Sequence, residues 1–435
     1  MKVLKFGGTS VGSAKRIEHV ADLISGASNK IVVLSAMSGT TNTLVEIANY
    51  LYKGNIPGAQ ETINTLEGKY QSTLRELFGE TGNSATEAIK KSFAVLRSFC
   101  NGTLTEAGEK EILSQGELMS TALMQSILER RGIRSHILPA LEFMRTLPGG
   151  EPDMGYITSR LKRMMELHPD VELFITQGYI CLNEYGGVDN LKRGGSDYTA
   201  SIIGAVLDAE EIQIWTDIDG MHNNDPRFVD GTHPVRTLHF EEAAELAYFG
   251  AKILHPACVL PAKLHNVPVR LLNTMEPDAP GTTICNTTPD GTIKAIAAKD
   301  NITAIKIKSG RMLLAYGFLH KIFETFDNYH TPIDMIATSE VGVTVTIDDR
   351  SQLKAIIEDL KAFGTVTVDK DMVIICVVGD LEWRNCGFEA RVISALEDIP
   401  IRMIAYGGSN YNISVLVQSC DKVRALKALS KSLFD

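Results

Sequence analysis

The chain lacks several features that would assign it to a specialised class of protein. Its 43 lysines and arginines are outnumbered by 53 aspartates and glutamates, for a formal net charge of −10. This balance argues against a broad surface for nucleic acid or for an anionic membrane. The N-terminus has no apolar signal segment, and no apolar run approaches the ~18 residues of a membrane span. We therefore expect neither nucleic-acid nor membrane partners.

Cysteine is also scarce and scattered. The seven cysteines are odd in number and never spaced as Cys-x-x-Cys, which is typical of reduced thiols rather than of a zinc site or a disulfide framework. We expect a cytoplasmic protein. Hydrophobic residues make up 44% and charged residues 22% of the 435 residues, as in ordinary globular proteins. The length predicts two or three domains.

The first two thirds of the chain alternate short apolar runs with helical stretches. This pattern predicts an α/β domain with a largely parallel sheet, whose ligands would bind beyond the carboxyl ends of the strands. The expected strands are residues 30–36, 171–180, 211–218 and 267–273, and the clearest helices are residues 117–132 and 241–254. A stretch rich in Pro, Gly and Thr at residues 276–292 is the candidate domain boundary.

An internal repeat follows that boundary. Residues 317–348 and 387–417 share one pattern: Gly-Phe, an amphipathic helix, a strand with Met-Ile-Ala, a turn and another strand. With strands before and after it, the first copy predicts a ferredoxin-like βαββαβ unit. The second copy lacks an evident last strand, which residues 292–299 could supply. We expect the domains 1–290 and 291–435, the latter holding modules at about 301–370 and 371–435.

Two glycine-containing motifs could cradle an anion. "VLKFGGTS" at residues 3–10 sends Lys5 toward a glycine pair and two hydroxyls, and "LKRGGSDYTAS" at residues 191–201 opens a helix with an arginine, two glycines, a serine and an aspartate. Glycines bare the backbone amides, and a helix N-terminus attracts anions. Each motif alone could be a plain turn. Two in one α/β domain favour an anion site.

The chain resembles the aspartate kinases over essentially its whole length, and among them the monofunctional, lysine-sensitive type. The motifs that carry the resemblance occur in the family's order: "KFGGTS" at 5–10, "SAMSGTTN" at 35–42, "SQGELMST" at 114–121, "KRGGSDYTA" at 192–200, "WTDIDG" at 215–220 and "FGAKILHPA" at 249–257. The resemblance implies an amino-acid-kinase domain, a carbamate-kinase-like three-layer αβα sandwich, followed by two ferredoxin-like ACT modules.

The implied reaction transfers the γ-phosphate of ATP to the β-carboxylate of L-aspartate, giving 4-phospho-L-aspartate, the first step of the pathway to lysine, threonine and methionine. The carboxylate is already ionised at neutral pH, so alignment and charge neutralisation carry the catalysis. Lys5 suits the γ-phosphate, and Asp197 would organise Lys5. Magnesium is implied by this chemistry rather than by any visible ligand cluster.

The resemblance also implies binding residues. Those for aspartate are Ser35, Thr41, Glu117, Arg193 and Ser196, and those for the nucleotide are Gly7, Gly8, Ser10, Gly194, Gly195, Thr216, Asp217, His222, Arg227 and Lys252. Without the family, Glu117 would be a solvated glutamate favoured by the helix dipole, and Lys252 a helix-terminal lysine facing water. His222 stands where many relatives carry tyrosine, which puts its contact with adenine in question.

Residues 309–319 and 333–341 resemble the lysine-binding segment of the regulatory modules. The implied effector site comprises Met312, Phe318, Leu319, Asp334, Ser339 and Glu340. Ala315 replaces a hydroxyl that lysine-regulated relatives usually have, so threonine or no effector stays open beside lysine. The same apolar residues could be packing the core of a ferredoxin-like module. Open sheet edges predict a homodimer or higher oligomer through the ACT modules.

Two rival functions remain at this point. Another amino-acid kinase, such as a glutamate or acetylglutamate kinase, is disfavoured by the ACT repeat and by the "KFGGTS" opening. A catalytically silent amino-acid sensor on the same scaffold predicts loss of Lys5, Arg193 or Asp197, and the chain has all three.

Overall fold

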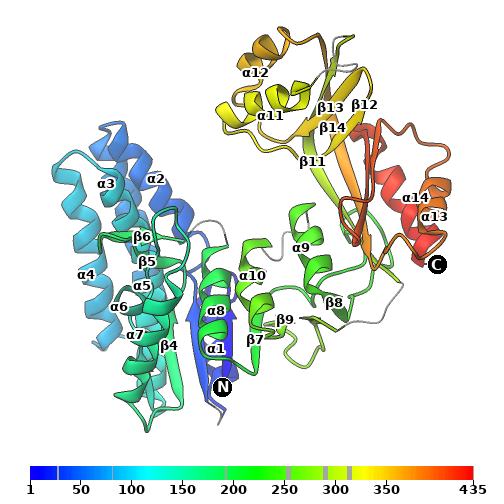
Figure 1. Ribbon diagram of the computed structural model, residues 1–435. Coiled ribbons are helices and arrows are strands. Elements are labelled where there is room, and N and C mark those ends of the chain that lie inside the picture. Colours follow the sequence, from blue (N-terminus) through cyan, green and yellow to red (C-terminus); the bar gives the residue numbers. More distant parts are fainter. Residues whose placement is uncertain are drawn as a thin grey trace. The chain divides into compact units, whose positions relative to one another are not determined.

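The computed structural model describes residues 1–26, 29–80, 82–191, 194–250, 256–287, 292–310 and 316–434. The chain forms two compact units (Figure 1). The first comprises Met1–Met221 and Ile253–Asn286, and the second comprises His222–Lys252 and Thr287–Asp435.

The first unit is built on a mostly parallel sheet. Its strands follow the order β3-β4-β2-β1-β7-β9-β10, and only the last of them runs antiparallel to its neighbour. The bounds are β1 (Lys2–Phe6), β2 (Lys30–Leu34), β3 (Ser135–Ile137), β4 (Leu173–Gln177), β7 (Glu211–Thr216), β9 (Val269–Asn273) and β10 (Thr282–Cys285). A separate hairpin joins β5 (Ile180–Leu182) to β6 (Val188–Asn190).

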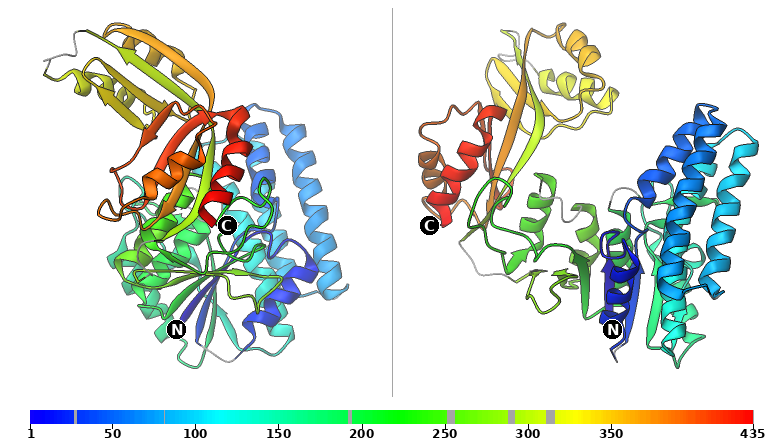
Figure 2. Two further views of the ribbon diagram at one scale, coloured as in Figure 1. Left: turned by 90° about the vertical axis from the view of Figure 1, so that its right-hand side faces the viewer. Right: turned by 180° about the vertical axis from the view of Figure 1, so that it is seen from behind.

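Helices cover both faces of this sheet, as Figure 2 shows from two further sides. They are α1 (Ala14–Ile24), α2 (Thr40–Tyr52), α3 (Ile56–Phe78), α4 (Ser84–Ser98), α5 (Glu106–Arg130), α6 (Ala140–Phe143), α7 (Met154–Glu166), α8 (Gly195–Val206) and α10 (Pro256–Leu264), with a short 3-10 turn at Phe99–Asn101. β2 and β4 are buried at every position, and their mostly apolar sequences KIVVL and LFITQ are typical of strands that are covered on both faces.

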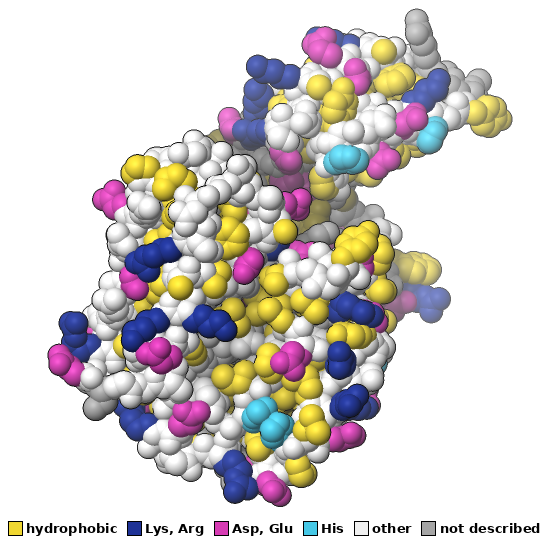
Figure 3. Space-filling model, turned by 90° about the vertical axis from the view of Figure 1, so that its left-hand side faces the viewer, with side chains coloured by type: hydrophobic (Ala, Val, Ile, Leu, Met, Phe, Trp, Pro, Cys, Tyr) yellow, Lys and Arg dark blue, Asp and Glu magenta, His cyan; other side chains and the backbone are white. Residues whose placement is uncertain are grey.

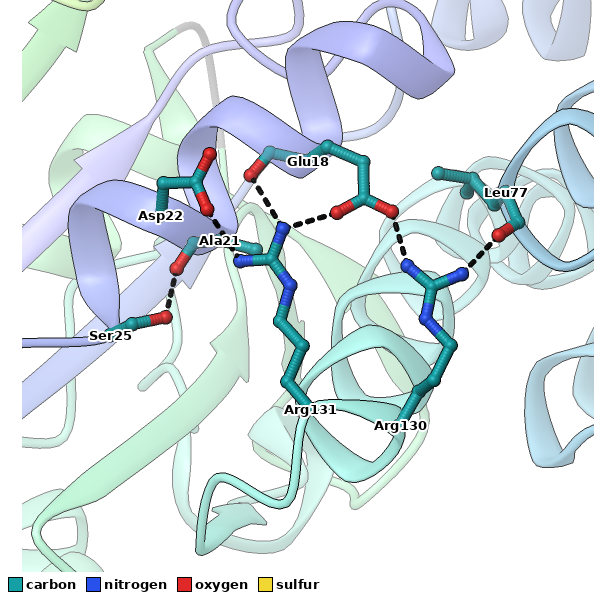
Figure 4. Close-up of polar contacts among 7 residues, drawn as sticks. All are labelled: Glu18, Ala21, Asp22, Ser25, Leu77, Arg130 and Arg131. Carbon is teal, nitrogen blue, oxygen red and sulfur yellow. Dashed lines mark hydrogen bonds and ion pairs between the residues drawn. The ribbon is translucent and has the colours of Figure 1, made fainter.

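An ion-pair network joins three of these helices (Figure 4). Glu18 on α1 accepts hydrogen bonds from both Arg130 and Arg131 at the end of α5. Arg131 also contacts Asp22 at 2.8 Å, and Arg130 donates to the carbonyl of Leu77 near the end of α3. The network joins α1, α3 and the C-terminal end of α5, about three helical turns beyond Glu117.

The second unit contains a six-stranded antiparallel sheet of order β12-β13-β11-β14-β16-β15. The strands are β11 (Ile293–Lys308), β12 (Ile336–Ser339), β13 (Gly342–Ile347), β14 (Thr365–Gly379), β15 (Met403–Ala405) and β16 (Asn412–Gln418). The helices are α11 (Phe318–Asn328), α12 (Leu353–Leu360), α13 (Phe388–Ala395) and α14 (Lys422–Phe434), with a 3-10 turn at Ser419–Asp421.

The two long central strands belong to both copies of the internal repeat. The second half of β11 pairs with β13 and with the first half of β14, while residues 293–299 pair with residues 374–379. Separate cores lie on the two halves, one with α11 and α12 and the other with α13 and α14. The predicted fold, an αβα sandwich followed by two ferredoxin-like modules, is confirmed.

The two compact units divide the chain differently from the predicted boundary at residue 290, because residues 222–252 belong to the second unit. This segment holds β8 (Thr237–His239) and α9 (Phe240–Tyr248). The carbonyl of Asn223 accepts a hydrogen bond from the amide of Ile296 at 2.8 Å, and Glu245 accepts one from Asn412 at 2.6 Å. Such contacts join residues far apart in sequence, so composition does not reveal them.

The surface agrees with the charge balance of the sequence. On the face drawn in Figure 3, lysines and arginines are interspersed with aspartates and glutamates. None of the helices in the described part of the chain is long and apolar enough to cross a membrane.

Candidate active site

A cavity of about 480 Å³ opens at the carboxyl ends of β1, β2 and β4. Ligands of open parallel sheets bind at this edge, and the volume suits a small molecule. The cavity is lined by Lys5, Gly8, Thr9, Ser35, Ala36, Met37, Ser38, Gly39, Thr41, Asn42, Glu117, Tyr179, Gly194, Gly195, Ser196 and Asp197. The wall of this cavity therefore contains every predicted aspartate-binding residue that the structure describes: Ser35, Thr41, Glu117 and Ser196.

Lys5 and Asp197 form an ion pair in that wall. Leu4 and Phe6 of β1 pack into the core under α1 to α5, so the alternation of a strand turns Lys5 to the opposite face. There its Nζ lies 2.6 Å from Oδ1 of Asp197, in the first turn of α8. The two side chains are only 11% and 13% exposed, so solvent ions screen this pair weakly.

Glu117 is a buried carboxylate with one unsatisfied oxygen. It lies in the middle of α5, is 3% exposed and lines the cavity. Its Oε1 accepts a hydrogen bond from the amide of Ala36 at 3.2 Å, whereas Oε2 has no partner. Burial raises the pKa of Glu117 to about 8, against a smaller lowering by the amide of Ala36. The solvated first-turn alternative is wrong.

Two hydroxyls hold the Glu117 turn of α5 in place. Ser120 donates to the carbonyl of Ser35 at 2.8 Å, and Thr121 donates to the carbonyl of Glu117 at 2.9 Å. Gln177 at the end of β4 donates to Thr121 at 2.9 Å. The ends of β2 and β4 thus position the carboxylate.

Two helix N-termini reach the cavity. The N-cap of α2 is Gly39, with φ of 81°, and the N-cap of α8 is Gly194, with φ of 74°; neither makes a side-chain capping bond. The first amides of a helix have no intrahelical acceptor and carry the positive end of its dipole. The cavity therefore offers two places where an anionic group is stabilised.

Close backbone packing explains the first glycine pair. The amide of Ser38 donates to the carbonyl of Gly8 at 3.0 Å. A Cβ on Gly8 would lie 2.8 Å from the carbonyl oxygen of Ala36, which is too close for any side chain. Gly8 thus lets the loop after β1 meet the loop after β2 at the cavity.

Tyr179 is a cavity residue that the sequence did not single out. It follows β4 with φ of 69°, a conformation that is an outlier for a bulky side chain. A Cβ on Gly195 would lie 2.6 Å from its ring. Burial, followed by nearby carboxylates, raises the pKa of Tyr179 to about 12. No local sequence signal marks the position.

Several predicted nucleotide residues lie in the first unit but outside the cavity wall. The amide of Gly7 donates to the carbonyl of Trp215 at 3.3 Å. Ser10 is buried, and its hydroxyl lies 2.7 Å from that of Thr274. Thr216 ends β7, which lies next to β1, and Asp217 follows it; the hydroxyl of Thr216 bonds to the backbone of Ile218.

The remaining nucleotide residues lie elsewhere. His222 and Arg227 belong to the second unit. His222 Nδ1 lies 3.1 Å from the hydroxyl of Thr232, and Arg227 pairs with Asp225 at 2.6 Å on the surface. Arg193, Lys252 and Met312, together with Ala315, lie outside the described residues.

The predicted effector residues occupy different environments in the second unit. Phe318 packs against the core of the first module, and Leu319, Ser339 and Glu340 are exposed. The carboxylate of Asp334 is buried and already engaged, by Lys299 at 2.6 Å and by the hydroxyl of Tyr248 at 2.9 Å.

Comparison with known proteins defines the class. The family model described as "Amino acid kinase family" matches residues 1–273, and the "ACT domain" model matches residues 375–433. Together with the cavity at the sheet edge, these matches make the chain an amino acid kinase with a C-terminal ACT domain.

Relatives over the full length define the family. The lysine-sensitive aspartokinase 3 of Escherichia coli is 33% identical, across 100% of this chain and 99% of the relative. The chloroplastic aspartokinase 1 of Arabidopsis thaliana is also 33% identical, across 100% of this chain and 80% of the relative. The chain belongs to the aspartokinase family.

Solved structures agree with that assignment. The crystal structure of E. coli aspartokinase III in complex with aspartate and ADP (R-state) matches with a TM-score of 0.86 and 33% identity. The same enzyme in complex with lysine and aspartate (T-state) matches with a TM-score of 0.81 and 32% identity. Both matches cover 100% of each chain.

Proposed function

We propose that the chain phosphorylates the β-carboxylate of L-aspartate with ATP in the cavity between β1, β2 and the N-termini of α2 and α8. The observation that carries this proposal is the combination of the Lys5–Asp197 ion pair and the buried, half-satisfied Glu117 in one wall. Aspartate offers an ammonium group to the carboxylate of Glu117 and carboxylates to the cationic and amide-rich parts of the wall.

Lys5 acts on the transferring phosphoryl group. Its ammonium neutralises charge that spreads over the phosphoryl oxygens in the transition state, and Asp197 holds it in position. The acceptor carboxylate is ionised at neutral pH and needs no base. Alignment by Glu117, Ser35, Thr41 and the amides of the helix N-termini supplies the rest.

Magnesium fits this reaction as an ion that enters with the nucleotide. The described residues hold no group of three or more His, Cys, Asp or Glu that could bind a metal ion by themselves. Mg²⁺ in kinases is held mostly by phosphate oxygens and water, with one or two protein carboxylates. The ion would offset phosphate charge, and the residues of this chain would orient the two substrates.

The second unit supports regulation by an amino acid, with lysine as the proposed effector. The E. coli relative is described as lysine-sensitive and has been solved with lysine. Lys299 and Tyr248 both contact Oδ1 of Asp334, whereas Oδ2 is buried without a hydrogen-bond partner and could receive a ligand ammonium. We also propose the domain limits 1–290 and 291–435 along the sequence, with residues 222–252 of the first domain belonging to the second compact unit. We further propose assembly as a homodimer or larger oligomer through the ACT modules, and a cytoplasmic location, in line with cysteines that form no disulfide in the described part of the chain.

The test is ATP-dependent acyl-phosphate formation, trapped as hydroxamate, with aspartate, glutamate and N-acetylglutamate compared as acceptors. We expect product from aspartate, and suppression of that product by lysine. Product from glutamate alone would replace this function by the rival kinase, and no product from any acceptor would favour the silent sensor. Activity insensitive to lysine but inhibited by threonine would change the effector only.

A further inference from the structure

Lys69 on α3 contacts the loop that forms one wall of the cavity, although it does not line the cavity itself. Its Nζ donates a hydrogen bond to the carbonyl of Ser38 at 2.6 Å. Ser38 and Gly39 both line the cavity, and a Cβ built on Gly39 would lie 3.9 Å from the same Nζ. The ammonium group is therefore next to the wall, at the turn that begins α2.

The neighbouring residues of α3 hold this contact in register. The hydroxyl of Tyr70 lies 3.2 Å from that of Thr40, the first residue of α2, and both side chains are fully buried. Thr73 donates to the carbonyl of Lys69 at 3.1 Å. Lys69 and Tyr70 thus contact Ser38 and Thr40, so one turn of α3 supports the turn that opens α2.

A cation beside the N-terminus of α2 would ordinarily lower the stability of that helix. The N-terminus of a helix carries the positive end of its dipole, where a carboxylate stabilises and an ammonium destabilises. Gly39, the N-cap, offers no side chain to the first amides of α2. The hydrogen bond to the Ser38 carbonyl offsets this cost, and an anion bound at the same turn would make the positive charge favourable.

The charge balance of the cavity supports such an anion site. Among the lining residues that the structure describes, Lys5 is the one cation, and Asp197 and Glu117 are anions. Lys5 is already paired with Asp197. A dicarboxylate that enters this cavity gains from positive charge beyond Lys5 and beyond Arg193, which the family resemblance assigns to the substrate, and Lys69 adds such charge at the N-terminus of α2. Desolvation by its neighbours lowers the pKa of Lys69, but the side chain is exposed, so salt can screen its charge.

We propose that Lys69 is a positioning residue for the dicarboxylate substrate: it fixes the Ser38–Gly39 turn through the Ser38 carbonyl and adds positive charge beside the first amides of α2. This inference rests on the proposed function, in which the acceptor is aspartate. Lys69 does not contact the reacting atoms, so its effect falls on aspartate binding rather than on the chemical step.

The test compares Lys69→Met, Lys69→Gln and Lys69→Arg with the wild type and with Lys90→Met as a matched control. Lys90 is an exposed lysine on α4, paired with Glu87 at 2.9 Å. Initial rates give kcat and the KM values for aspartate and ATP at low and high salt. Calorimetry with aspartate alone measures binding without turnover, and thermal unfolding checks the fold of each variant.

We expect Lys69→Met to raise the KM and Kd for aspartate about five- to tenfold, as for the net loss of one ordinary hydrogen bond, with kcat and the KM for ATP near wild type. Lys69→Arg should restore most of the affinity, and Lys69→Gln, which keeps a donor but not the charge, should lie between. The affinity of Lys69→Met should depend less on salt than that of the wild type. Lys90→Met should change none of these values.

Three results would overturn the proposal. In the first, Lys69→Met binds aspartate like the wild type. In the second, kcat and both KM values change together with a lower unfolding temperature, which means a structural role only. In the third, Lys69→Gln matches the wild type in a folded protein and the salt dependence is unchanged, which removes the charge from the argument. A wild type inactive with aspartate, by contrast, refutes the proposed function before any Lys69 variant is considered.

Discussion

The buried carboxylate of Glu117 predicts a pH dependence of aspartate capture. Burial raises its pKa to about 8 in the unliganded protein, so near neutral pH most molecules carry a protonated Glu117. Only the ionised form can pair with the ammonium group of aspartate. Binding then selects the ionised fraction, and a proton is released to solvent when aspartate enters at neutral pH.

The size of the effect follows from that pKa. The ionised fraction of a group with a pKa of about 8 rises from roughly one tenth at about pH 7 to roughly three quarters at about pH 8.5. Because apparent affinity scales with the competent fraction, kcat/KM for aspartate should rise roughly eightfold over this interval. The kcat should stay nearly flat, since the bound ammonium keeps Glu117 ionised in the complex.

The assay is a set of initial-rate profiles in aspartate at saturating ATP, between about pH 6.5 and about pH 8.5. Glu117→Gln should lower kcat/KM and abolish its rise with pH. Glu106→Gln, an exposed glutamate at the start of the same helix, should keep the wild-type profile. Calorimetry in buffers of different ionisation enthalpy should detect the released proton for the wild type alone.

Stability should change with the opposite sign. A folded pKa above the unfolded value means that the native state binds more protons, so this group costs stability as pH rises from about 4.5 toward about 8. Glu117→Gln should therefore become more stable relative to the wild type as pH rises through that window. A flat kcat/KM profile for the wild type, or an equal rise in Glu117→Gln, would refute the reasoning.

Three further predictions test other parts of the molecule. Asp197→Asn keeps the shape of the side chain but removes the negative charge that holds Lys5 at 2.6 Å. The kcat should therefore fall about a hundredfold or more, while the melting curve stays unchanged. A near-normal kcat would contradict the role given to the ion pair. Lys299→Met leaves the buried carboxylate of Asp334 without its cation, so calorimetry should show that the free energy of unfolding falls by about 3 kcal/mol. Lys306→Met, on the same strand, should show no such loss, and equal melting of the two variants would count against the role of the ion pair. Glu18→Gln weakens contacts to both Arg130 and Arg131 (Figure 4), so denaturant unfolding should show a free energy of unfolding lower by about 1 kcal/mol. This difference should shrink at high salt, and a difference that does not respond to salt would exclude an electrostatic origin.

Local patterns in the sequence were sufficient for much of the fold. Short apolar runs that alternate with helical stretches predicted the strands β2, β4, β7 and β9, because parallel strands are buried on both faces. The Gly-Phe repeat predicted the two ferredoxin-like modules, since each copy carries its own helix and strand periods. These features depend on neighbours within a few residues, so the order of amino acids determines them.

Part of the site could be predicted in the same way. Lys5 and Asp197 each lie beside a glycine pair, at the end of a strand and at the start of a helix. Two such motifs in one α/β domain favoured an anion site at the carboxyl ends of the strands, and the family resemblance implied that Asp197 organises Lys5. Their distance and their shielding from solvent are properties of the folded sheet.

The tertiary structure alone decided the rest, because the decisive contacts join residues that are distant in sequence. Glu117 is buried only since α5 packs on the loop after β2, and Ser10 turns away from the cavity toward Thr274, 264 positions later. Lys69 reaches Ser38 because the folding of α3 against α2 brings together residues 31 positions apart. Composition and periodicity describe which face of an element is apolar, but the partner of each polar group depends on packing between elements.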